Sequence, residues 1–406
     1  MFPLLGIDSI WMVLLSAGFS AFSTVWIGLA ALNFVATLVV GGLFFHAVRA
    51  TKWLRDCPPA ENATALPKVS LIAPARNEER QIEAAVRSLL RLDYPDLQIT
   101  LVNDRSTDGT AAILDRLAVE NPRLNVIHLQ ELPGGWLGKN HALQFGADHS
   151  DGEWLLFTDA DVVFEPSAVR RAIRHAQENQ VDHLVATPET KMPTWLLAAF
   201  VATFGLHFLL FVRAWAIRDK NSSAHVGVGA FNLIRARVYR AIGGHRPIAM
   251  RPDDDLKLGK LVKLHGYQQD LVNGNEMIFV QWYSSLKELI RGLEKNAFAA
   301  LEYSVLAVCL SSLAVVMFNL FPIIALFFAS GATFWLHAAS LLVLSGLYLA
   351  SAWNMKLHWT AAFGFPLAVL LFVYIQWRTM FLTFKNKGIQ WRDTHYSLAE
   401  LRANKV

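Results

Sequence analysis

Cysteine and charge are both scarce in this chain of 406 residues, and each shortage excludes a class of protein. The only cysteines, Cys57 and Cys309, form no Cys-x-x-Cys pattern and lie in different regions, so neither a disulfide framework nor a zinc site is expected. Charged residues make up 17% of the chain and hydrophobic residues 54%, a composition more hydrophobic than that of a typical soluble enzyme. No run of Lys and Arg with interleaved aromatics occurs, so the net charge of +4 predicts no nucleic-acid partner.

Long stretches without Lys, Arg, Asp or Glu indicate a membrane protein. A spanning helix needs about 20 apolar residues, and four segments qualify: 24–48, 303–328, 332–353 and 361–384. We expect a shorter interfacial or tilted piece at 10–22, ahead of the first crossing. Arg49, Lys52 and Arg55 follow that crossing, and by the positive-inside rule they predict a cytoplasmic domain. The expected location is the cell inner (cytoplasmic) membrane, crossed several times.

The distribution of charge divides the chain into four parts. We expect an N-terminal membrane segment at 1–55, a cytoplasmic domain at 56–300, transmembrane helices at 301–384 and a basic tail at 385–406. Three crossings after the domain would put the tail on the opposite side of the membrane, whereas its Lys and Arg residues favour the cytoplasmic side. The stretch 303–328 contains Asn319 and Pro322, and it is our candidate for a re-entrant segment or a hairpin.

Within the charged middle of the chain, strand-like and helix-like patterns alternate. Strands are predicted in 68–79, 97–110, 124–129 and 153–162, and helices in 80–92, 111–120 and 140–150. This alternation predicts an α/β fold with a mainly parallel sheet covered by helices. Ligands of such sheets bind at the carboxyl ends of the strands. Polar residues gather at those ends, in 76–79, in 103–108 and at 159–161.

Asp159 and Asp161 stand two residues apart at the end of the apolar run in LLFTDADVVF. In a strand, both side chains would point to the same face and their charges would repel. A divalent cation removes this repulsion, and Mn2+ or Mg2+ completes its coordination with water and substrate phosphates. The pair therefore predicts Mn2+ or Mg2+ together with a phosphorylated ligand. The alternative is a solvated turn without a ligand.

Six blocks, in this order, resemble those of family 2 glycosyltransferases: APARNEE, LVNDRSTDGT, GWLGKNHAL, LFTDADV, GAFNLIRARVYRAIGGH and DDDLKLGKLVKLHGY. The match covers about residues 68–300. The membrane segments, RGLEKNAF and the tail GIQWRDTHYSLAEL look like the multi-pass branch with hopanoid-associated, carotenoid-type and ceramide-type enzymes. The resemblance implies the Rossmann-like GT-A fold and an inverting hexosyltransferase. It also implies a nucleotide-sugar donor, with a UDP-sugar expected, and a lipid acceptor.

The resemblance assigns roles residue by residue. Those expected to bind the nucleotide sugar are Pro74, Arg76, Glu78, Asp104, Asp108, Lys139 and Asp159. Asp159 and Asp161 are expected to hold the metal. Aligned with the family pattern, Asp255 is the catalytic base and Asp254 is the acidic residue before it. Because 253–255 are all Asp, an alignment shifted by one residue also remains open. Those expected near the acceptor or the diphosphate are Gly229, Trp282, Arg291, Trp391 and Arg392.

The chemistry of sugar transfer requires the same groups. A single carboxylate takes the proton of the acceptor hydroxyl as it attacks, and one in-line attack inverts the anomeric carbon. Retaining hydrolases need a second carboxylate. Processive family members carry Gln-x-x-Arg-Trp after the base, but QWYSS has Ser284 and Ser285 at the Arg and Trp positions. This departure favours the addition of one sugar over polysaccharide synthesis.

The apolar stretch 194–215 is long enough to span a membrane, but it lies between Asp161 and Asp255. One crossing there would separate the metal pair from the base, so we expect interfacial helices near 194–215 and 286–300. The alternatives are a polysaccharide or polyprenyl-phosphate sugar transferase, a nucleotidyltransferase, a transporter and a scaffold. APARNEE lacks the glycines of a phosphate loop, and ionisable groups lie near span ends, which disfavours the nucleotidyltransferase and the transporter.

Overall fold

An eight-stranded sheet forms the centre of the structure, a computed structural model that describes residues 7–60, 66–391 and 394–406. Its strand order is β1-β10-β7-β9-β5-β2-β3-β4, and only β9 runs antiparallel to its neighbours. The predicted mainly parallel α/β sheet is therefore confirmed. The strands are β1 (Lys52–Trp53), β2 (Val69–Ala75), β3 (Leu97–Asp104), β4 (Leu124–Leu129), β5 (Trp154–Phe157), β7 (His183–Thr187), β9 (Asn232–Arg235) and β10 (Gln269–Asn273).

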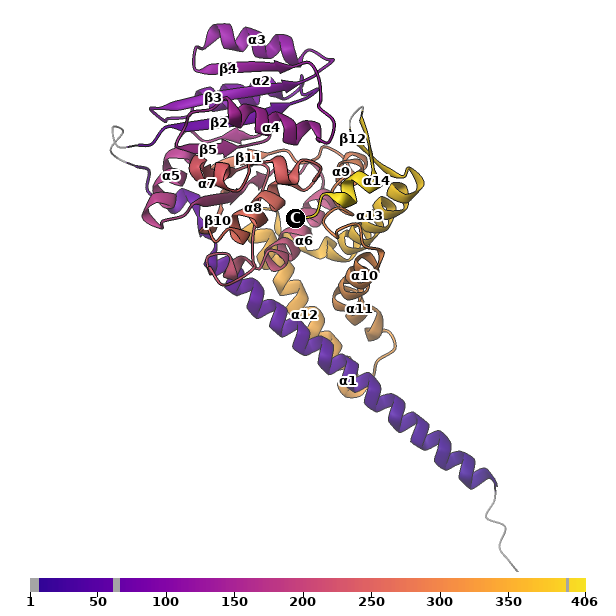
Figure 1. The fold of residues 1–406 in the computed structure, drawn as a ribbon. Helices are drawn as coiled ribbons and strands as arrows, with labels where there is room; N and C mark the ends of the chain where they lie inside the picture. The colour runs from indigo at the N-terminus through magenta and orange to yellow at the C-terminus, as the bar shows by residue number, and fades with distance from the viewer. Residues whose placement is uncertain (1–6, 61–65, 392–393) are drawn as a thin grey trace, which may run out of the picture.

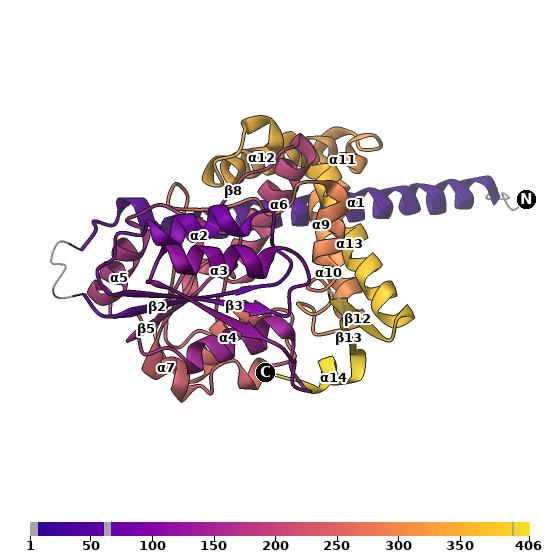
Figure 2. The ribbon, with the colours of Figure 1, turned by 90° about the horizontal axis from the view of Figure 1, so that it is seen from above.

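Helices cover both faces of this sheet, as Figure 2 shows. The helices of one face are α2 (Ile82–Leu90), α3 (Thr110–Glu120) and α5 (Ala168–Glu178). Those of the other are α4 (Gly138–Asp148), α7 (Ala236–Ala241) and α8 (Asp254–Leu264). A small second sheet, in the order β6-β11-β8, lies beside the first and consists of β6 (Val163–Phe164), β8 (Glu189–Thr190) and β11 (Ile278–Val280).

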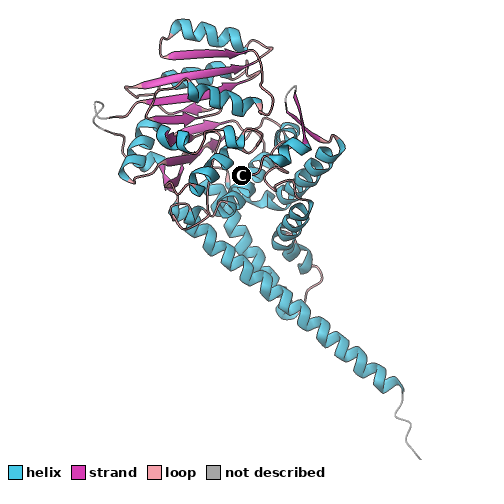
Figure 3. Ribbon diagram, viewed as in Figure 1, coloured by secondary structure: helices cyan, strands magenta, loops and turns pink. Residues whose placement is uncertain are grey.

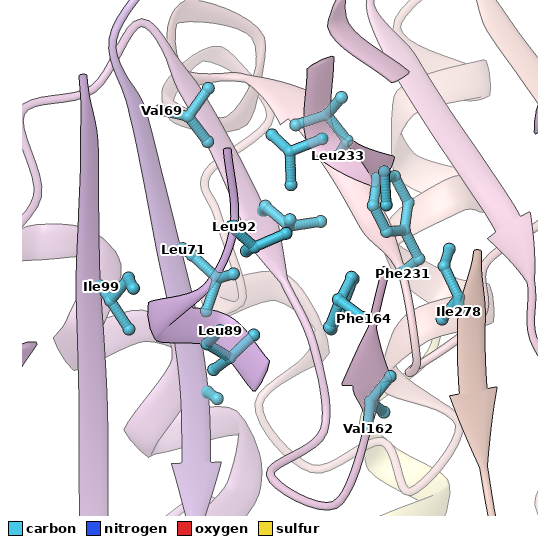
Figure 4. Close-up of a cluster of buried hydrophobic side chains, with 14 of the residues drawn as sticks. Val69, Leu71, Leu89, Leu92, Ile99, Val162, Phe164, Phe231, Leu233 and Ile278 are labelled. Atoms are coloured by element: carbon cyan, nitrogen blue, oxygen red, sulfur yellow. The ribbon is translucent and has the colours of Figure 1, made fainter. Parts of the chain in front are cut away.

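Successive side chains of β2 enter different cores because neighbouring residues of a strand point to opposite faces. Val69 and Leu71 pack with Leu89 of α2, and Figure 4 shows this cluster extending to Phe231. Ile72 belongs to the opposite cluster, with α4, α7 and α8. With both faces buried, β2 is apolar along its length and its carboxyl end is held rigidly where the polar loops begin.

The rest of the molecule is almost entirely helical (Figure 3). Four described segments are long and apolar enough to cross a membrane: Thr24–Ala50, Trp195–Ala216, Gly331–Asn354 and Trp359–Lys385. The first belongs to α1 (Ile7–Ala50), a single uninterrupted helix. The stretch 10–22 is continuous with the helix of the first crossing, and its interfacial or tilted position stays a prediction.

The stretch 303–328 is not one helix. It divides at Leu320 into α10 (Val305–Asn319) and α11 (Phe321–Leu326), with Pro322 at the start of the second. These two helices lead away from the sheet, and α12 (Gly331–Asn354) returns beside α1 (Figure 1). At the end of α12 the carbonyl oxygen of Asn354 accepts a hydrogen bond from Nδ2 of Asn275 (2.8 Å), so the hairpin closes on the sheet domain.

Helix α13 (Phe365–Lys385) starts beside α6 and ends beside the sheet domain. Ahead of α13, the carbonyl oxygen of Thr360 accepts a hydrogen bond from Nε1 of Trp195 (2.9 Å). After α13, the hairpin of β12 (Gly388–Trp391) and β13 (Thr394–Ser397) packs Tyr396 against Leu137. The tail, including α14 (Leu398–Ala403), is thus docked on the domain.

Helix α6 (Trp195–Phe211) fills the space between the sheet domain and the long apolar helices. Its residues Ala202 and Leu206 pack in one cluster with Val226 of the domain, Phe44 of α1 and Tyr348 of α12. The protein itself buries 56% of this apolar segment, while Trp195 and Phe211 at the helix ends stay exposed. The second predicted interfacial helix, α9 (Leu286–Leu293), ends earlier than the expected 286–300.

Candidate active site

We had expected Asp159 and Asp161 to lie within the strand predicted in 153–162. Strand β5 ends at Phe157, so both residues lie in the turn after it. The turn is tied to the segment before β9. The backbone N–H of Asp159 donates to the carbonyl oxygen of Gly229 (3.0 Å), and Oγ1 of Thr158 donates to that of Ala230 (2.8 Å). The pair is therefore held by backbone geometry at the carboxyl end of the sheet.

Lys139 joins residues that are far apart in the sequence. Its Nζ lies 2.9 Å from Oδ1 of Asp159 and 3.5 Å from Oδ1 of Asp254. Asp159 precedes α6 and Asp254 follows it, so a single membrane crossing by α6 is excluded. The site that this lysine organises takes residues from α4, from the turn after β5 and from the start of α8. They line one pocket together with Leu143, Phe157, Thr158, Gly229, Asn232, His245 and Asp255.

The pKa values of Asp159 and Asp161 are shifted in opposite directions. Burial, followed by the charges of Asp159 and Glu78, raises the pKa of Asp161 to about 7. Burial also opposes ionisation of Asp159, but the charge and hydrogen bond of Lys139 outweigh it and hold the pKa of Asp159 below its usual value. A second positive charge beside Asp161 would remove the repulsion that keeps its proton bound.

Asp159 and Asp161 fit a divalent cation by this criterion. Two carboxylates are the protein ligands that Mg2+ and Mn2+ often use, and Asp161 gains most from a nearby cation. In the part of the chain that the structure describes, no three or more His, Cys, Asp or Glu side chains are grouped to hold a metal ion. Any cation here would therefore complete its coordination with water and with oxygens of the substrate.

Gly229 lines the pocket where a larger residue has no room. A Cβ atom at this position would lie 2.6 Å from Oδ2 of Asp159 and 3.3 Å from Nζ of Lys139. We expect Gly229→Ala to displace both groups and to lower kcat/KM by about 10²-fold, because misplacement by an ångström has an effect of this size. Turnover of the purified variant measures it. Gly134→Ala is the matched control, since a Cβ there meets nothing within 4 Å.

The triple Asp at 253–255 divides into three different environments. Both oxygens of Asp253 accept hydrogen bonds from the Arg251 guanidinium, each at 2.9 Å, so this residue is fully engaged in a buried ion pair. Asp254 faces Lys139, and Asp255 lines the pocket. Burial, followed by the charge of Asp254, raises the pKa of Asp255 to about 7. Asp254 and Asp255 both line the pocket, so the register that makes Asp255 the base stays a prediction.

Arg251 fixes the start of this motif. Its side chain is only 1% exposed, and it also lies 2.9 Å from Oε2 of Glu302. Removing one partner of a buried pair leaves an uncompensated charge, so we expect Arg251→Met to lower the free energy of unfolding by about 3–5 kcal/mol. The midpoint of thermal unfolding in detergent measures the loss. Arg246→Met is the control, because the exposed Arg246–Asp148 pair contributes only about 0–1 kcal/mol.

The loops after β2 and β3 meet through Asp104. One of its oxygens lies 3.6 Å from a guanidinium nitrogen of Arg76, and the other lies 2.7 Å from Nε of Arg105. A Cβ on Gly138 would lie 2.3 Å from Oδ2 of Asp104, so the start of α4 approaches this carboxylate closely. Pro74 is paired with Val102 near the ends of the same strands. The predicted nucleotide residues are thus brought together, and their contact with a nucleotide stays a prediction.

Asp108 and Glu78 lie in the same pair of loops. The oxygens of Asp108 accept hydrogen bonds from the backbone N–H groups of Glu79 (3.2 Å) and Thr110 (3.0 Å), which fixes the loop before α3. The backbone N–H of Glu78 donates to Oγ1 of Thr110 (2.8 Å). The charge of Glu78 acts on Asp161, so this residue links the nucleotide loops to the metal pair.

The residues predicted near the acceptor or the diphosphate are only partly brought together. The ring of Trp282 packs against Phe204 of α6, with 5.0 Å between centroids. Arg291 is exposed on α9. The ammonium of Lys295 lies 4.2 Å from the ring centroid of Trp391 in β12. Arg392 lies outside the described residues.

Sequence reasoning missed several residues of the site. Asn232 and His245 line the pocket, and both belong to the GAFNLIRARVYRAIGGH block, where a signal was available. Burial, followed by the charge of Lys139, lowers the pKa of His245 to about 3, so its ring is neutral. Tyr283 lies close enough for the charges of Asp159 and Asp161 to raise its pKa, after burial and Glu288.

Comparison with known proteins gives the same family as the six sequence blocks. Residues 70–243 match the family model described as Glycosyl transferase family 2. Two 4,4'-diaponeurosporenoate glycosyltransferases of Staphylococcus aureus, strains USA300 and NCTC 8325 / PS 47, are each 28% identical over 179 residues, or 44% of this chain. The match spans 46% of the length of those relatives. Residues 70–243 are therefore a family 2 glycosyltransferase domain.

Two solved structures are similar at low sequence identity. One is the mannosyltransferase PcManGT from Pyrobaculum calidifontis in complex with GDP-Man and Mn2+, with a TM-score of 0.46 and 18% identity over 88% of this chain and 92% of that one. The other is TarS from S. aureus, with a TM-score of 0.39 and 17% identity over 57% of this chain and 40% of that one.

Proposed function

We propose that this protein is an inverting, metal-dependent membrane glycosyltransferase that moves one sugar from a UDP-sugar to a hydroxyl of a lipid acceptor. The observation that carries this proposal is the contact of Lys139 with both Asp159 and Asp254. It gathers Asp159 of the carboxylate pair and the base motif around one pocket. Donor and acceptor sites of a one-step transfer must meet in this way, because the attacking oxygen and the leaving group lie on opposite sides of one carbon.

The chain's own residues divide the work of the reaction. Asp255, with a pKa of about 7, is substantially ionised at neutral pH and takes the proton of the acceptor hydroxyl. Lys139 holds a fixed positive charge beside the departing diphosphate. Asp159 and Asp161 would hold Mn2+ or Mg2+, which when bound supplies further positive charge against the diphosphate. Asp254 keeps Lys139 oriented between the two halves of the site.

A lipid acceptor and a cytoplasmic domain are supported by the surroundings of the site. The apolar helices α1, α12 and α13 lie next to α6, which directly adjoins the domain. The similar staphylococcal proteins are named as glycosyltransferases of diaponeurosporenoate, which is consistent with an apolar acceptor. Arg49, Lys52 and Arg55 at the end of α1 and the docked basic tail favour a domain on the cytoplasmic side.

The test is nucleotide release by the protein purified in detergent. It is incubated with Mn2+ and with UDP-, GDP- or dTDP-sugars, in the presence and absence of extracted membrane lipids. We expect release of UDP that requires the metal and that increases with lipid. Formation of UTP and sugar 1-phosphate from the UDP-sugar, seen only when pyrophosphate is added, would instead indicate a nucleotidyltransferase. No release from any donor in the presence of lipid would refute the proposed function.

A further inference from the structure

A second pocket, of about 390 Å³, lies where the end of α1 meets α5. Among the described residues, it shares no lining residue with the pocket around Lys139. Cys57 and His175 both line it. The pocket therefore brings a thiol and an imidazole together at the end of a candidate membrane-spanning segment.

The two ring nitrogens of His175 connect this thiol to a buried carboxylate. Nδ1 lies 3.4 Å from Sγ of Cys57, and Nε2 lies 2.8 Å from Oδ2 of Asp270 in β10. His175 and Asp270 are each only 3% exposed, whereas Cys57 is half-buried. A nucleophile, a base in contact with it and a carboxylate that orients the base are the parts of an activated nucleophile.

Neighbouring residues fix both ends of this arrangement. The second oxygen of Asp270 lies 3.4 Å from Nε of Arg218. At the other end, the guanidinium of Arg174 in α5 donates a hydrogen bond to the carbonyl oxygen of Pro59 (2.8 Å). The segment that carries Cys57 is thereby held against the helix that carries the imidazole.

The charge of His175 favours a nucleophilic sulfur. Burial opposes protonation of the ring, but the hydrogen bonds and charges of Asp270 and Cys57 outweigh it and raise the pKa of His175 to about 9. The ring is therefore positively charged at neutral pH, and positive charge beside the sulfur is typical of reactive cysteines. The sulfur also lies 3.6 Å from the carbonyl oxygen of Trp53, which is a partner only for a protonated thiol. The reactivity of Cys57 distinguishes these two states.

The lining of the pocket indicates the chemistry of its ligand. Val48 and Trp53 give it an apolar side next to the end of the candidate span. Positive charges in the lining outnumber negative ones, with Arg49, Lys52, Arg174 and His175 against Asp56 and Glu178. A ligand that combines an apolar chain with phosphate groups matches both features.

We propose that Cys57 is a site of S-acylation, which takes a long-chain acyl group from an acyl thioester of a phosphorylated carrier. The sulfur of Cys57 attacks the carbonyl carbon of the thioester, and the bond from this carbon to the sulfur of the carrier breaks. His175 gives its proton to the departing sulfur, so the products are S-acyl Cys57 and the free thiol of the carrier. No oxidant or reductant is consumed. The acyl chain then adds a second membrane anchor beside α1.

The test incubates the full chain in detergent with palmitoyl-CoA and follows its intact mass. We expect one acyl group that hydroxylamine removes, mapped to Cys57 by peptide mass spectrometry and absent from Cys57→Ser. His175→Gln and Asp270→Asn are each expected to slow its addition by about 10²-fold, the lower end of what a positioned acid–base group contributes. Cys309→Ala removes the other thiol of the chain and is the matched control, with an unchanged rate expected.

Both slow variants alter a buried pair, so the midpoint of thermal unfolding is recorded for each. Asp270→Asn keeps the size of the side chain and decides the outcome if His175→Gln does not fold. An absence of acylation at Cys57, or an equal rate in Asp270→Asn, would overturn the inference and leave these contacts a purely structural role. Acylation of Cys309 as fast as that of Cys57 in the unaltered protein would overturn it as well.

Discussion

Asp255→Asn is expected to lower kcat by about 10²–10⁴-fold while donor binding stays within a few fold. The amide has the size of the carboxylate but accepts no proton from the acceptor hydroxyl, and general-base catalysis contributes a factor of this order. Steady-state turnover and nucleotide titration, made on the same preparation, separate the two effects. Asp254→Asn is the informative comparison, because it tests the neighbouring register of the motif directly.

The pH profile gives a second signature of the same residue. The pKa of Asp255 is raised to about 7 by burial and by Asp254, and only the ionised form accepts a proton. We therefore expect kcat/KM to rise with pH through about 7 and to level off above about 8. The residual activity of Asp255→Asn is expected to lack this rise. A profile that is flat between pH 5.5 and 8, or a larger loss in Asp254→Asn, would contradict the assignment.

Asp161→Asn and chelation of the metal are each expected to lower turnover by about 10³-fold or more, because both remove the cation that offsets charge on the leaving diphosphate. Their effects on stability differ. The pKa of Asp161 is about 7 in the folded chain and about 4 when unfolded. The folded state therefore binds this proton more tightly, and the stability that protonation provides is lost as pH rises from about 4 to 7.

Because ionisation of Asp161 lowers the stability of the folded chain, Asp161→Asn is expected to be inactive and yet more stable than the unaltered protein. At pH 8 without metal, Asp161→Asn is expected to raise the midpoint of thermal unfolding, and at pH 4 to leave it nearly unchanged. Mn2+ is expected to raise the midpoint of the unaltered protein at pH 8 and to have little effect on the variant. Tryptophan fluorescence during heating measures both. A lower midpoint at pH 8, or an undiminished response to Mn2+, would count against a metal at this pair.

Local patterns were sufficient to predict the sheet domain. The apolar runs that became β2, β3 and β4 and the amphipathic segments that became α2 and α3 begin and end close to where their periodicity placed them. Strand β5 is the exception, because it ends at Phe157. Apolar residues continue past that point in a turn, and composition alone does not distinguish a buried turn from a strand.

The contents of the site were harder to predict than its place. Three adjacent aspartates are alike in sequence, and only the position of Arg251 shows that Asp253 is occupied in an ion pair. Lys295 and Trp391 are separated by four apolar helices, so their contact depends on the path of α10 to α13. Counting spans in the sequence had left the side of the tail undecided. The same path explains why the tail lies beside the domain, because α13 starts beside α6 and ends at the domain.

The ion pair between buried Arg251 and the partly exposed Glu302 has a practical consequence for anyone wishing to isolate the sheet domain alone. Glu302 lies just ahead of α10, and Lys257 of α8 contacts the same carboxylate. Cutting the chain at residue 300 would discard this partner, together with the hairpin that covers Leu137. The severed fragment would expose apolar surface and would leave Arg251 and Lys257 without the carboxylate of Glu302. The sheet domain and the apolar helices that follow it are thus parts of one folding unit.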